Sequence, residues 1–515
     1  MCGILFVDQK KKDISFSNFK KVLSLQNWRG PNNTSFISIN QKKILLGHNR
    51  LSILDTKSRS NQPMISGDGR YFLIFNGEIY NYKTIIKKYN LKLKTLSDSE
   101  VILQGYILKG KKILKDLDGM FSFIIFDKKK NKWFCARDRY GIKPLFIFQD
   151  NTKTVIGSEA GSIARLLNLR IDNKSISEWK LMRHPTPNYS FFKKLYQFPK
   201  SSYLTSSSLN YTSYYKLKKK NKIISQKKII SLITESVERH QMGDVNSTSL
   251  LSGGIDSAII LDNAKKINNC YSVGLERNNE FNAARNIAKK LNKKISLIQV
   301  RSRELKNSWR YLTNLRGEPL SVPNEGLIYL VCKKMKKKEK IVLTGEGADE
   351  IFFGYDRIFR WALKQKKFNF NKFIQFYSYS KTIKPTKRLK EYILNLKGKK
   401  KVINFIEDFF YDFHLPVLLR RMDFASMAAS KEARVPFVTK KIIDNLYRIN
   451  QNIKIDQTFS KKPLRKYLKS SNLNFVLKTK KIGFSANLNE SFDKYDEYKL
   501  FQNIVLSTFR KIFKK

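Results

Sequence analysis

The sequence predicts an α/β and α+β protein of two domains, the second of which contains a doubly wound parallel sheet. The chain has 515 residues, more than one hydrophobic core normally serves. Residues 247–258 have the pattern of a strand, a Ser-Gly-Gly turn and a helix. Strand patterns at 271–275 and 295–300 then flank a helix pattern at 282–291, as in a parallel sheet built from βα units.

The composition excludes several classes of protein. With 41% hydrophobic and 13% aromatic residues, the chain can bury large cores and is not a disordered chain. No run of about 18 apolar residues occurs, so we expect no membrane-spanning helix. The first residues lack the basic region and the long apolar run of a signal peptide. Four cysteines without Cys-x-x-Cys spacing are typical of a reducing cytoplasm and disfavour structural zinc.

The formal net charge is +59, a balance that ordinarily suggests nucleic acid or an anionic membrane as a partner. The lysines are spread along the chain instead of forming one basic arm, with clusters at Lys10–Lys12, Lys128–Lys130, Lys218–Lys220, Lys336–Lys338 and Lys399–Lys401. We therefore interpret them as solvated surfaces with a weak, salt-sensitive affinity for polyanions. We expect no specific nucleic-acid partner and no membrane.

The N-terminus offers a candidate nucleophile. Cysteine at position 2 is small enough for Met1 to be removed, which would leave Cys2 with a thiol and a free α-amine. That amine, with a pKa of about 7.7–8.0, can act as the base for its own nucleophile. The alternative is an ordinary buried cysteine near a terminus.

The segments that follow Cys2 supply suitable partners. A strand-like run at 47–55 carries Arg50. A strong strand at 71–75 is followed by Asn76-Gly77, a dipeptide that marks a sharp turn. The Asn76 side chain and the Gly77 N–H could face a developing oxyanion. Residues 97–100 cap a helix expected from Val101, and further strands are expected within 117–127 and 133–146.

In this order, these residues resemble the class II (N-terminal nucleophile) glutamine amidotransferase domain over residues 2–205. The resemblance implies a four-layer αββα sandwich of the Ntn-hydrolase type. It implies that Cys2 attacks the glutamine side-chain amide, with Asn76 and Gly77 as the oxyanion hole. Arg50 would bind the α-carboxylate of glutamine, and Glu78 and Asp98 its α-amine. The implied glutamine-binding set is Arg50, Leu51, Ser52, Ile53, Leu54, Asn76, Gly77, Glu78 and Asp98.

Two positions depart from that family. The usual Arg-Gly-Pro-Asp is Arg29-Gly-Pro-Asn32 here, and Trp28 stands where histidine is common. Residues 206–225 are polar and lysine-rich, and we interpret them as a linker. A helix expected over 226–241 then opens the second domain, which we place at 226–515.

The second domain begins with the motif Ser252-Gly-Gly-Ile-Asp-Ser257. A glycine-rich turn between a strand and a helix lets backbone N–H groups approach phosphate closely, and the hydroxyls of Ser252 and Ser257 can add donors. Asp256 beside phosphate indicates Mg²⁺ between them. The alternative is an ordinary glycine-rich βα turn. The motif is not the Gly-x4-Gly-Lys-Ser/Thr loop, so phosphoryl transfer is disfavoured.

A second motif, at 341–355, is rich in acids. A short strand ends in Gly345-Glu346-Gly347, and Asp349 and Glu350 follow. Asp349 could share Mg²⁺ with Asp256, or the acids could belong to an ordinary helix start. A helix is expected from Arg421 to Ala433, and the cations of residues 460–465 could meet pyrophosphate.

Both motifs together resemble the pyrophosphate-loop (PP-loop) domain of glutamine-hydrolysing asparagine synthetases. The resemblance implies Glu346 in formation of an acyl-adenylate. The implied ATP and pyrophosphate site is Leu250, Ser252, Gly253, Gly254, Asp256, Ser257, Val273, Thr344, Gly345 and Lys461, and Mg²⁺ would be held by Asp256 and Asp349. Ile255, Ala258 and Phe353 depart from the family, and we expect Phe353 to reshape the acceptor pocket.

The resemblance implies an ATP-dependent carbon–nitrogen ligase that uses ATP, Mg²⁺ and glutamine to convert aspartate to asparagine. The alternative is the same two domains acting on another carboxylate, such as a uronic-acid sugar. A further alternative is a basic nucleic-acid-binding protein that retains an inactive synthetase fold, against which the intact Cys2, Arg50, Asp98, Asp256 and Glu346 argue. A homodimer is also implied.

Overall fold

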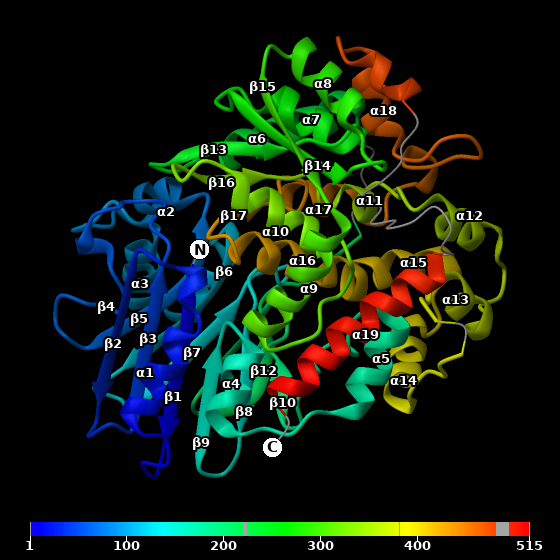
Figure 1. Ribbon diagram of the computed structural model, residues 1–515. Helices are drawn as coiled ribbons and strands as arrows, with labels where there is room; N and C mark the ends of the chain where they lie inside the picture. The colour runs from blue at the N-terminus through cyan, green and yellow to red at the C-terminus, as the bar shows by residue number, and fades with distance from the viewer. Residues whose placement is uncertain (1, 220–223, 381, 480–493, 514–515) are drawn as a thin grey trace.

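Two six-stranded antiparallel sheets face each other in the first part of the chain (Figure 1). The computed structural model describes residues 2–219, 224–380, 382–479 and 494–513. The first sheet, in the order β10-β8-β9-β1-β3-β2, consists of β1 (Gly3–Gln9), β2 (Asn33–Ile39), β3 (Ile44–Arg50), β8 (Phe146–Gln149), β9 (Lys153–Gly157) and β10 (Leu195–Gln197). The second, in the order β12-β11-β7-β6-β5-β4, consists of β4 (Met64–Ile65), β5 (Tyr71–Ile79), β6 (Gly119–Asp127), β7 (Lys132–Arg137), β11 (Ser202–Thr205) and β12 (Ser208–Ser213).

Helices cover the outer faces of both sheets. They are α1 (Phe16–Ser24), α2 (Tyr82–Tyr89), α3 (Asp98–Lys109) and α4 (Ala160–Leu167). Helix α5 (Asn173–Met182) instead packs against the second part of the chain, where Trp179 Nε1 donates to the Leu320 carbonyl at 2.7 Å. On β5, Phe72 and Ile74 point into the core between the sheets, while Leu73 and Phe75 pack beneath α2 and α3. The strand is continuously apolar because both of its faces are buried. The predicted αββα sandwich is confirmed.

The Asn76-Gly77 dipeptide lies inside β5, so the predicted sharp turn is wrong. Asn76 pairs with Ser122 and Gly77 with Phe121 on β6. A Cβ at Gly77 would lie 2.1 Å from the carbonyl oxygen of Met120. Glycine is required here because the two strands approach closely, which the dipeptide pattern does not distinguish from a turn.

Other boundaries also differ from the sequence pattern. β3 ends at Arg50, although the apolar run continues to 55. The expected linker, 206–225, contains the edge strand β12, on which Tyr211 packs against Phe198 at 5.1 Å between ring centroids. The sequence of an edge strand is polar when one of its faces is exposed to solvent. The sequence of β12 therefore has the same composition as a linker. Residues 220–223 of the expected linker lie outside the described residues, as does Met1.

The second domain contains a parallel sheet in the order β15-β14-β13-β16-β17. Its strands are β13 (Asn246–Leu250), β14 (Asn269–Leu275), β15 (Lys294–Val300), β16 (Glu339–Leu343) and β17 (Glu432–Arg434). The chain first winds outward from β13 to β15 and then returns to add β16 and β17 on the other side. The predicted doubly wound sheet is confirmed. The order reverses between β13 and β16, where ligands of such sheets usually bind.

Helices lie on both faces of this sheet. On one side are α6 (Gln226–His240), α7 (Ile255–Asn263), α8 (Phe281–Lys290), α17 (Lys440–Leu446) and α18 (Lys462–Lys469). On the other are α9 (Ser302–Arg316), α10 (Glu325–Lys334) and α16 (Leu415–Met427). The helix predicted over 421–433 is therefore wrong beyond Met427. The chain turns at Ser430, whose φ is 55°, and then forms β17 beside β16.

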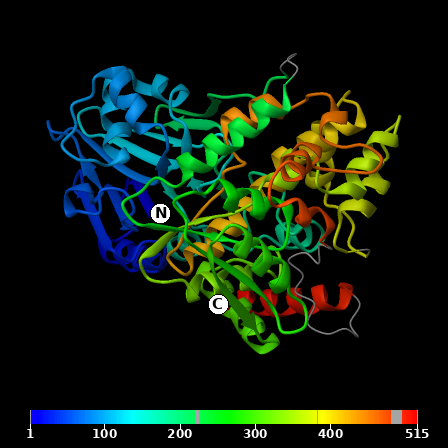
Figure 2. The ribbon, with the colours of Figure 1, turned by 90° about the horizontal axis from the view of Figure 1, so that it is seen from above.

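An additional group of helices, rich in aromatic residues, extends from the parallel sheet (Figure 2). It contains α11 (Ala348–Ile351), α12 (Asp356–Lys364), α13 (Phe370–Tyr377), α14 (Lys387–Lys397), α15 (Val402–Phe409) and a π-helical turn at Phe410–His414. The last helix, α19 (Lys494–Ile512), packs on α9. Phe509 of α19 also contacts Phe191 and Phe192 of the first domain. Among the described residues no helix has the length and apolarity needed to cross a membrane.

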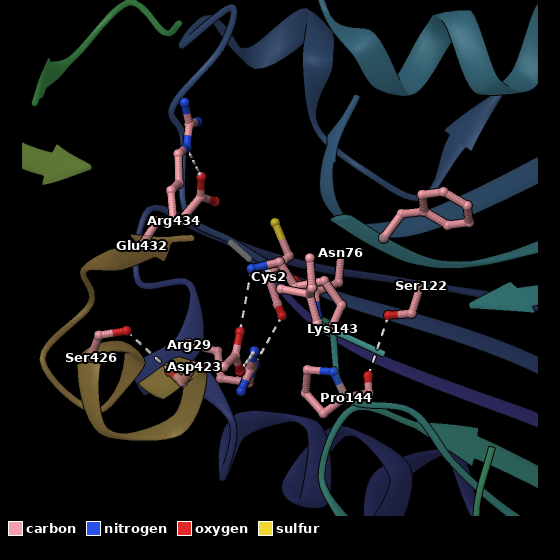
Figure 3. A network of polar contacts seen from close by, with 12 residues as sticks. Cys2, Arg29, Asn76, Ser122, Lys143, Pro144, Asp423, Ser426, Glu432 and Arg434 are labelled. Carbon is pink, nitrogen blue, oxygen red and sulfur yellow. Dashed lines mark hydrogen bonds and ion pairs between the residues drawn. The ribbon is translucent and has the colours of Figure 1, made fainter. Parts of the chain in front are cut away.

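A buried ion cluster joins the two domains (Figure 3). The Arg29 guanidinium lies 2.6 Å from Glu159 and 2.8 Å from Asp423 of α16. The Lys143 ammonium lies 3.3 Å from the same Asp423. All four side chains are buried. Arg29 and Lys143 hold the pKa of the Asp423 carboxyl below its ordinary value, although burial alone would raise it.

Replacing Asp423 with alanine is expected to destabilise the protein by about 3–5 kcal/mol, because Lys143 and Arg29 would each lose a carboxylate in a buried site. The shift of the urea denaturation midpoint measures this loss. The control is Asp13→Ala. The pair of Asp13 with Lys153 is 2.7 Å long but leaves Asp13 43% exposed, so the change should stay below about 1 kcal/mol. Equal shifts in the two variants would contradict a structural role for the cluster.

Candidate active sites

Cys2 lies immediately before β1, between groups from three segments (Figure 3). Its backbone N–H donates to Asn76 Oδ1 at 2.9 Å, and its carbonyl oxygen accepts from Arg29 Nε at 3.0 Å. Cys2 is buried, with 8% of its surface exposed. The backbone of Cys2 is thus fixed on both sides.

Of the two polar atoms of the Asn76 side-chain amide, one forms a hydrogen bond and the other does not. The side chain is fully buried on β5. Its Oδ1 is occupied by Cys2, whereas Nδ2 has no hydrogen-bond partner among the residues that the structure describes. A buried donor without an acceptor is costly. Beside a thiol, such a donor can stabilise negative charge on an oxygen that develops there.

Two acids lie close to this region. Asp98, at the start of α3, accepts from the backbone N–H of Ile79 at 2.8 Å. Glu78 lies 3.4 Å from Arg434 of β17, across the domain boundary. Burial raises the pKa of Asp98 to about 6, with a smaller contribution from Glu432. Burial, together with Glu432 and Asp98, raises the pKa of Glu78 well above its usual value.

Within the described chain, Glu78 Oε2 has no hydrogen-bond partner. An ammonium group beside Glu78 and Asp98 would favour the charged form of both carboxyls, which burial and the neighbouring acids disfavour.

Arg50 lies at the end of β3 with its terminal nitrogens held by the loop that follows. Nη1 donates to the carbonyl of Lys57 and to Asn61 Oδ1, each at 2.8 Å. Nη2 donates to the carbonyls of Leu54, at 3.4 Å, and Asp55, at 2.5 Å. Burial lowers the Arg50 pKa, and the nearby charges of Cys2, Asp55 and Asp98 partly offset this. Arg50 therefore lies close enough to Cys2 and Asp98 to interact with them electrostatically.

The loop 51–55 connects this region to the second domain. Asn32, one of the family departures, accepts from the Ser52 N–H at 3.0 Å. Lys340 donates to the Ser52 carbonyl at 3.1 Å. Asp244 contacts the loop twice, through Ile53 and Asp55. Asn32 thus holds the expected glutamine-binding loop in place. Within this loop, Leu51 and Ile53 are buried.

A second cavity, of about 350 Å³, lies where the strand order of the parallel sheet reverses. Its lining includes the expected Leu250, Ser252, Asp256, Ser257, Thr344, Gly345, Glu346 and Asp349. Val273 belongs to the hydrophobic core and is not among the lining residues. The phosphate loop and the acidic turn are thus brought to one place, although 90 residues separate them in the sequence.

The phosphate loop is held by its own serines. Ser257 Oγ accepts from the Ser252 N–H at 3.1 Å, and Ser252 Oγ accepts from the Gly254 N–H at 3.1 Å. The Gly253 N–H donates to Glu280 at 3.1 Å. Helix α7 starts directly after Gly254. This is a rigid turn at a helix N-terminus, which suits an anion.

Lys461 lies between the two carboxylates predicted to hold a metal. Its ammonium is 2.6 Å from Asp256 and 2.5 Å from Asp349. Burial opposes its charge, but the two carboxylates outweigh burial and raise its pKa. A Cβ at Gly354 would lie 1.9 Å from Asp349 Oδ1 and 2.2 Å from Lys461 Cε, so any larger residue there would displace these two side chains.

The metal prediction rests on these two carboxylates. In the described part of the chain, no group of three or more His, Cys, Asp or Glu side chains is arranged to hold a metal ion. Two convergent carboxylates are enough for Mg²⁺ when substrate phosphates supply further ligands.

The sequence did not single out several residues of this cavity. Arg421 of α16 contacts Glu346 at 2.5 Å. Tyr355 donates to Glu350 at 2.7 Å and contacts His414 at 3.0 Å. Arg183, from the end of α5 in the first domain, also lines the cavity. In a chain with 101 lysines and arginines, nothing in the local sequence distinguishes these two arginines.

Phe353 lies outside the acceptor side of the cavity. It is fully buried, stacks on Phe359 at 4.1 Å and lies below the ammonium of Lys454 at 4.3 Å. Its φ of 61° turns the chain ahead of Gly354. It is not among the cavity-lining residues, so any effect of Phe353 on the shape of the cavity is exerted through its neighbours, and this expectation stays a prediction.

Comparison with known proteins identifies relatives of both halves. A family model described as "Glutamine amidotransferase domain" matches residues 1–215, and one described as "Asparagine synthase" matches 228–510. Asparagine synthetase [glutamine-hydrolyzing] 1 of Bacillus subtilis is 27% identical over 94% of this chain and 87% of its own length. Asparagine synthetase B [glutamine-hydrolyzing] of Escherichia coli is 27% identical over 88% and 76%.

A viral relative is slightly more similar over a shorter span. The probable asparagine synthetase [glutamine-hydrolyzing] of Acanthamoeba polyphaga mimivirus is 30% identical over 69% of this chain and 68% of its own length. The asparagine synthase match alone spans more than half of the chain. With an amidotransferase domain in front of a nucleotide-type cavity, the chain belongs to the asparagine synthase family.

Proposed function

We propose that this protein catalyses glutamine-dependent synthesis of asparagine. ATP adenylates the side-chain carboxylate of aspartate, and ammonia released from glutamine at Cys2 displaces AMP. The products are asparagine, AMP, pyrophosphate and glutamate. The observation that carries the proposal is the presence in one chain of a fixed Cys2–Asn76 pair and a cavity that combines a phosphate loop with Glu346.

At the first site, the Cys2 thiolate attacks the glutamine amide after removal of Met1, with the Cys2 amine as base. The spare Asn76 Nδ2 and the Gly77 N–H stabilise the oxyanion. Ammonia leaves, and water hydrolyses the thioester to glutamate. Arg50 orients the α-carboxylate, and Asp98 holds the α-amine, with Glu78 accepting a hydrogen bond beside it.

At the second site, the Ser252–Ser257 loop binds the phosphates of ATP. Mg²⁺ held by Asp256 and Asp349 would neutralise phosphate charge, which suits these hard oxygen ligands. Lys461 lies between the same carboxylates and supplies a further cation for the phosphates. Activation is necessary because a carboxylate at neutral pH resists attack by ammonia. Glu346 lies beside the reacting groups, where Arg421 sets its orientation.

An acceptor screen tests the proposal. With ATP, Mg²⁺ and glutamine, aspartate is expected to give pyrophosphate and asparagine, measured by coupled assay and mass spectrometry. Cys2→Ala should abolish the glutamine-dependent reaction but keep the reaction with free ammonia, because only the nitrogen source is lost. Intact mass checks the removal of Met1. A uronic acid that replaces aspartate in the screen would instead establish the alternative acceptor.

Gly354→Ala is expected to lower pyrophosphate release by at least tenfold, because the new methyl group would overlap Asp349 and Lys461. Glutamine hydrolysis should persist, since Cys2 lies in the other domain. Gly67→Ala is the control, because the nearest atom to its Cβ is Lys94 Nζ at 3.8 Å. Normal pyrophosphate release in Gly354→Ala would show that the Lys461–Asp349 contact is not needed.

Glutamine hydrolysis is expected to lose activity at acidic pH. Asp98, with a pKa of about 6, binds the α-amine as a carboxylate, so protonation weakens binding. The kcat/KM for glutamine, which reports the free enzyme, should fall as pH decreases through about 6. Asp98→Asn should be slower and lack this limb. A wild-type profile that stays flat down to pH 5 would refute the assignment.

A further inference from the structure

Arg183 is a cation of the first domain that lines the cavity of the second. It follows the last residue of α5 with φ 68° and ψ −1°, a left-handed conformation that costs a residue other than glycine about 1 kcal/mol or more. Such strain persists only where the surroundings enforce it. The position of this side chain is therefore determined by the fold around it.

The second domain holds the end of α5 in place. Trp179 Nε1 donates to the Leu320 carbonyl at 2.7 Å. The Tyr379 N–H donates to the Leu181 carbonyl at 2.9 Å. The Arg183 guanidinium then lies over the Tyr379 ring at 4.0 Å from its centroid, which fixes its plane.

Among the described residues, no carboxylate is paired with the charge of Arg183. The other cations of this region each contact a carboxylate: Arg421 contacts Glu346, and Lys461 contacts Asp256 and Asp349. Within residues 2–219, 224–380, 382–479 and 494–513, no carboxylate forms an ion pair with Arg183, and its buried Nε has no hydrogen-bond partner. A half-buried guanidinium that lines a cavity without an internal anion is suited to an anionic ligand.

Arg183 belongs to the part of the cavity around Tyr355 and His414. Arg183 and Arg421 both contribute, after burial, to a pKa of His414 well below its usual value. His414 contacts Tyr355, which donates to Glu350. ATP phosphates have their own donors at the Ser252–Ser257 loop.

We propose that Arg183 binds a carboxylate of the acceptor other than the one that reacts, so that the acceptor is a dicarboxylate such as aspartate. The inference rests on the proposed function of this cavity. A carboxylate held in a bidentate pair by a guanidinium is poorly placed to attack phosphorus. The reacting carboxylate must instead lie near Glu346 and the α-phosphate. Arg183 would thus select against acceptors that carry a single carboxylate, including uronic acids.

The test compares acceptors in the presence of ATP, Mg²⁺ and free ammonia, so that glutamine is not needed. Aspartate is compared with β-alanine, which keeps the reacting carboxylate and the amine but lacks the second carboxylate, and with galacturonate. The wild type should prefer aspartate over β-alanine by about 100-fold or more in kcat/KM. R183Q should raise the KM for aspartate about 30-fold or more, leave the KM for ATP unchanged and reduce the preference to a few-fold.

Two further variants separate binding from folding. R183K keeps the charge but not the planar fork, and should lie between the wild type and R183Q. K174Q removes one positive charge from an exposed position of the same helix and should match the wild type. Glutamine hydrolysis and thermal unfolding report whether R183Q is folded. If R183Q does not fold, an R183K enzyme with wild-type preference for aspartate overturns the inference.

The outcomes distinguish this inference from the proposed function. If the wild type amidates aspartate and R183Q keeps its KM, the inference fails and the function stands. A rise in the KM for ATP alone would also overturn the inference, because Arg183 would then serve the phosphates. If aspartate is inert but another dicarboxylate reacts in an Arg183-dependent way, the inference stands and asparagine synthesis fails. A wild-type enzyme that prefers galacturonate overturns both.

Discussion

The buried ion pairs of Asp423 with Arg29 and Lys143 fix the position of the first domain against helix α16 of the second. Arg29 also donates to the carbonyl of Cys2, so the same guanidinium holds the candidate nucleophile and takes part in the domain contact. Asp423 lies two positions after Arg421 on α16, which places the two side chains about 200° apart around the helix axis. Asp423 faces Arg29, and Arg421 faces Glu346. A single helix therefore positions groups in both candidate sites.

Local electrostatics differ sharply from the overall charge. The chain carries +59, yet its candidate sites contain several carboxylates in buried or partly buried positions. Glu78 and Asp98 have raised pKa values because burial and neighbouring acids disfavour their charge. Asp256 and Asp349 instead share the ammonium of Lys461. The excess lysines lie mostly in solvent, where they have little influence on these groups.

The sequence predicted those features that depend on local chemistry. The phosphate loop and the acidic turn are each contained in a short stretch of sequence. The alternation of strand and helix patterns over residues 247–300 predicts the doubly wound sheet. Asn76-Gly77 was misread because glycine serves a turn and a close strand approach equally well. β17 was missed because three residues carry no periodicity. Arg183, Arg421 and Asp423 could not be assigned, since their partners come from distant segments and the chain is full of basic residues.

Helix α5 has a consequence for how such enzymes can be rearranged. It belongs to the amidotransferase half in sequence, but its end forms part of the wall of the nucleotide-type cavity. The two halves are therefore not interchangeable modules with a simple boundary near the polar stretch at 206–225. A chimera that took its first 205 residues from a relative would also replace Arg183, and with it part of the wall of this cavity. A substitution made in the first 205 residues can therefore change the shape of a cavity that the second half of the chain mostly forms.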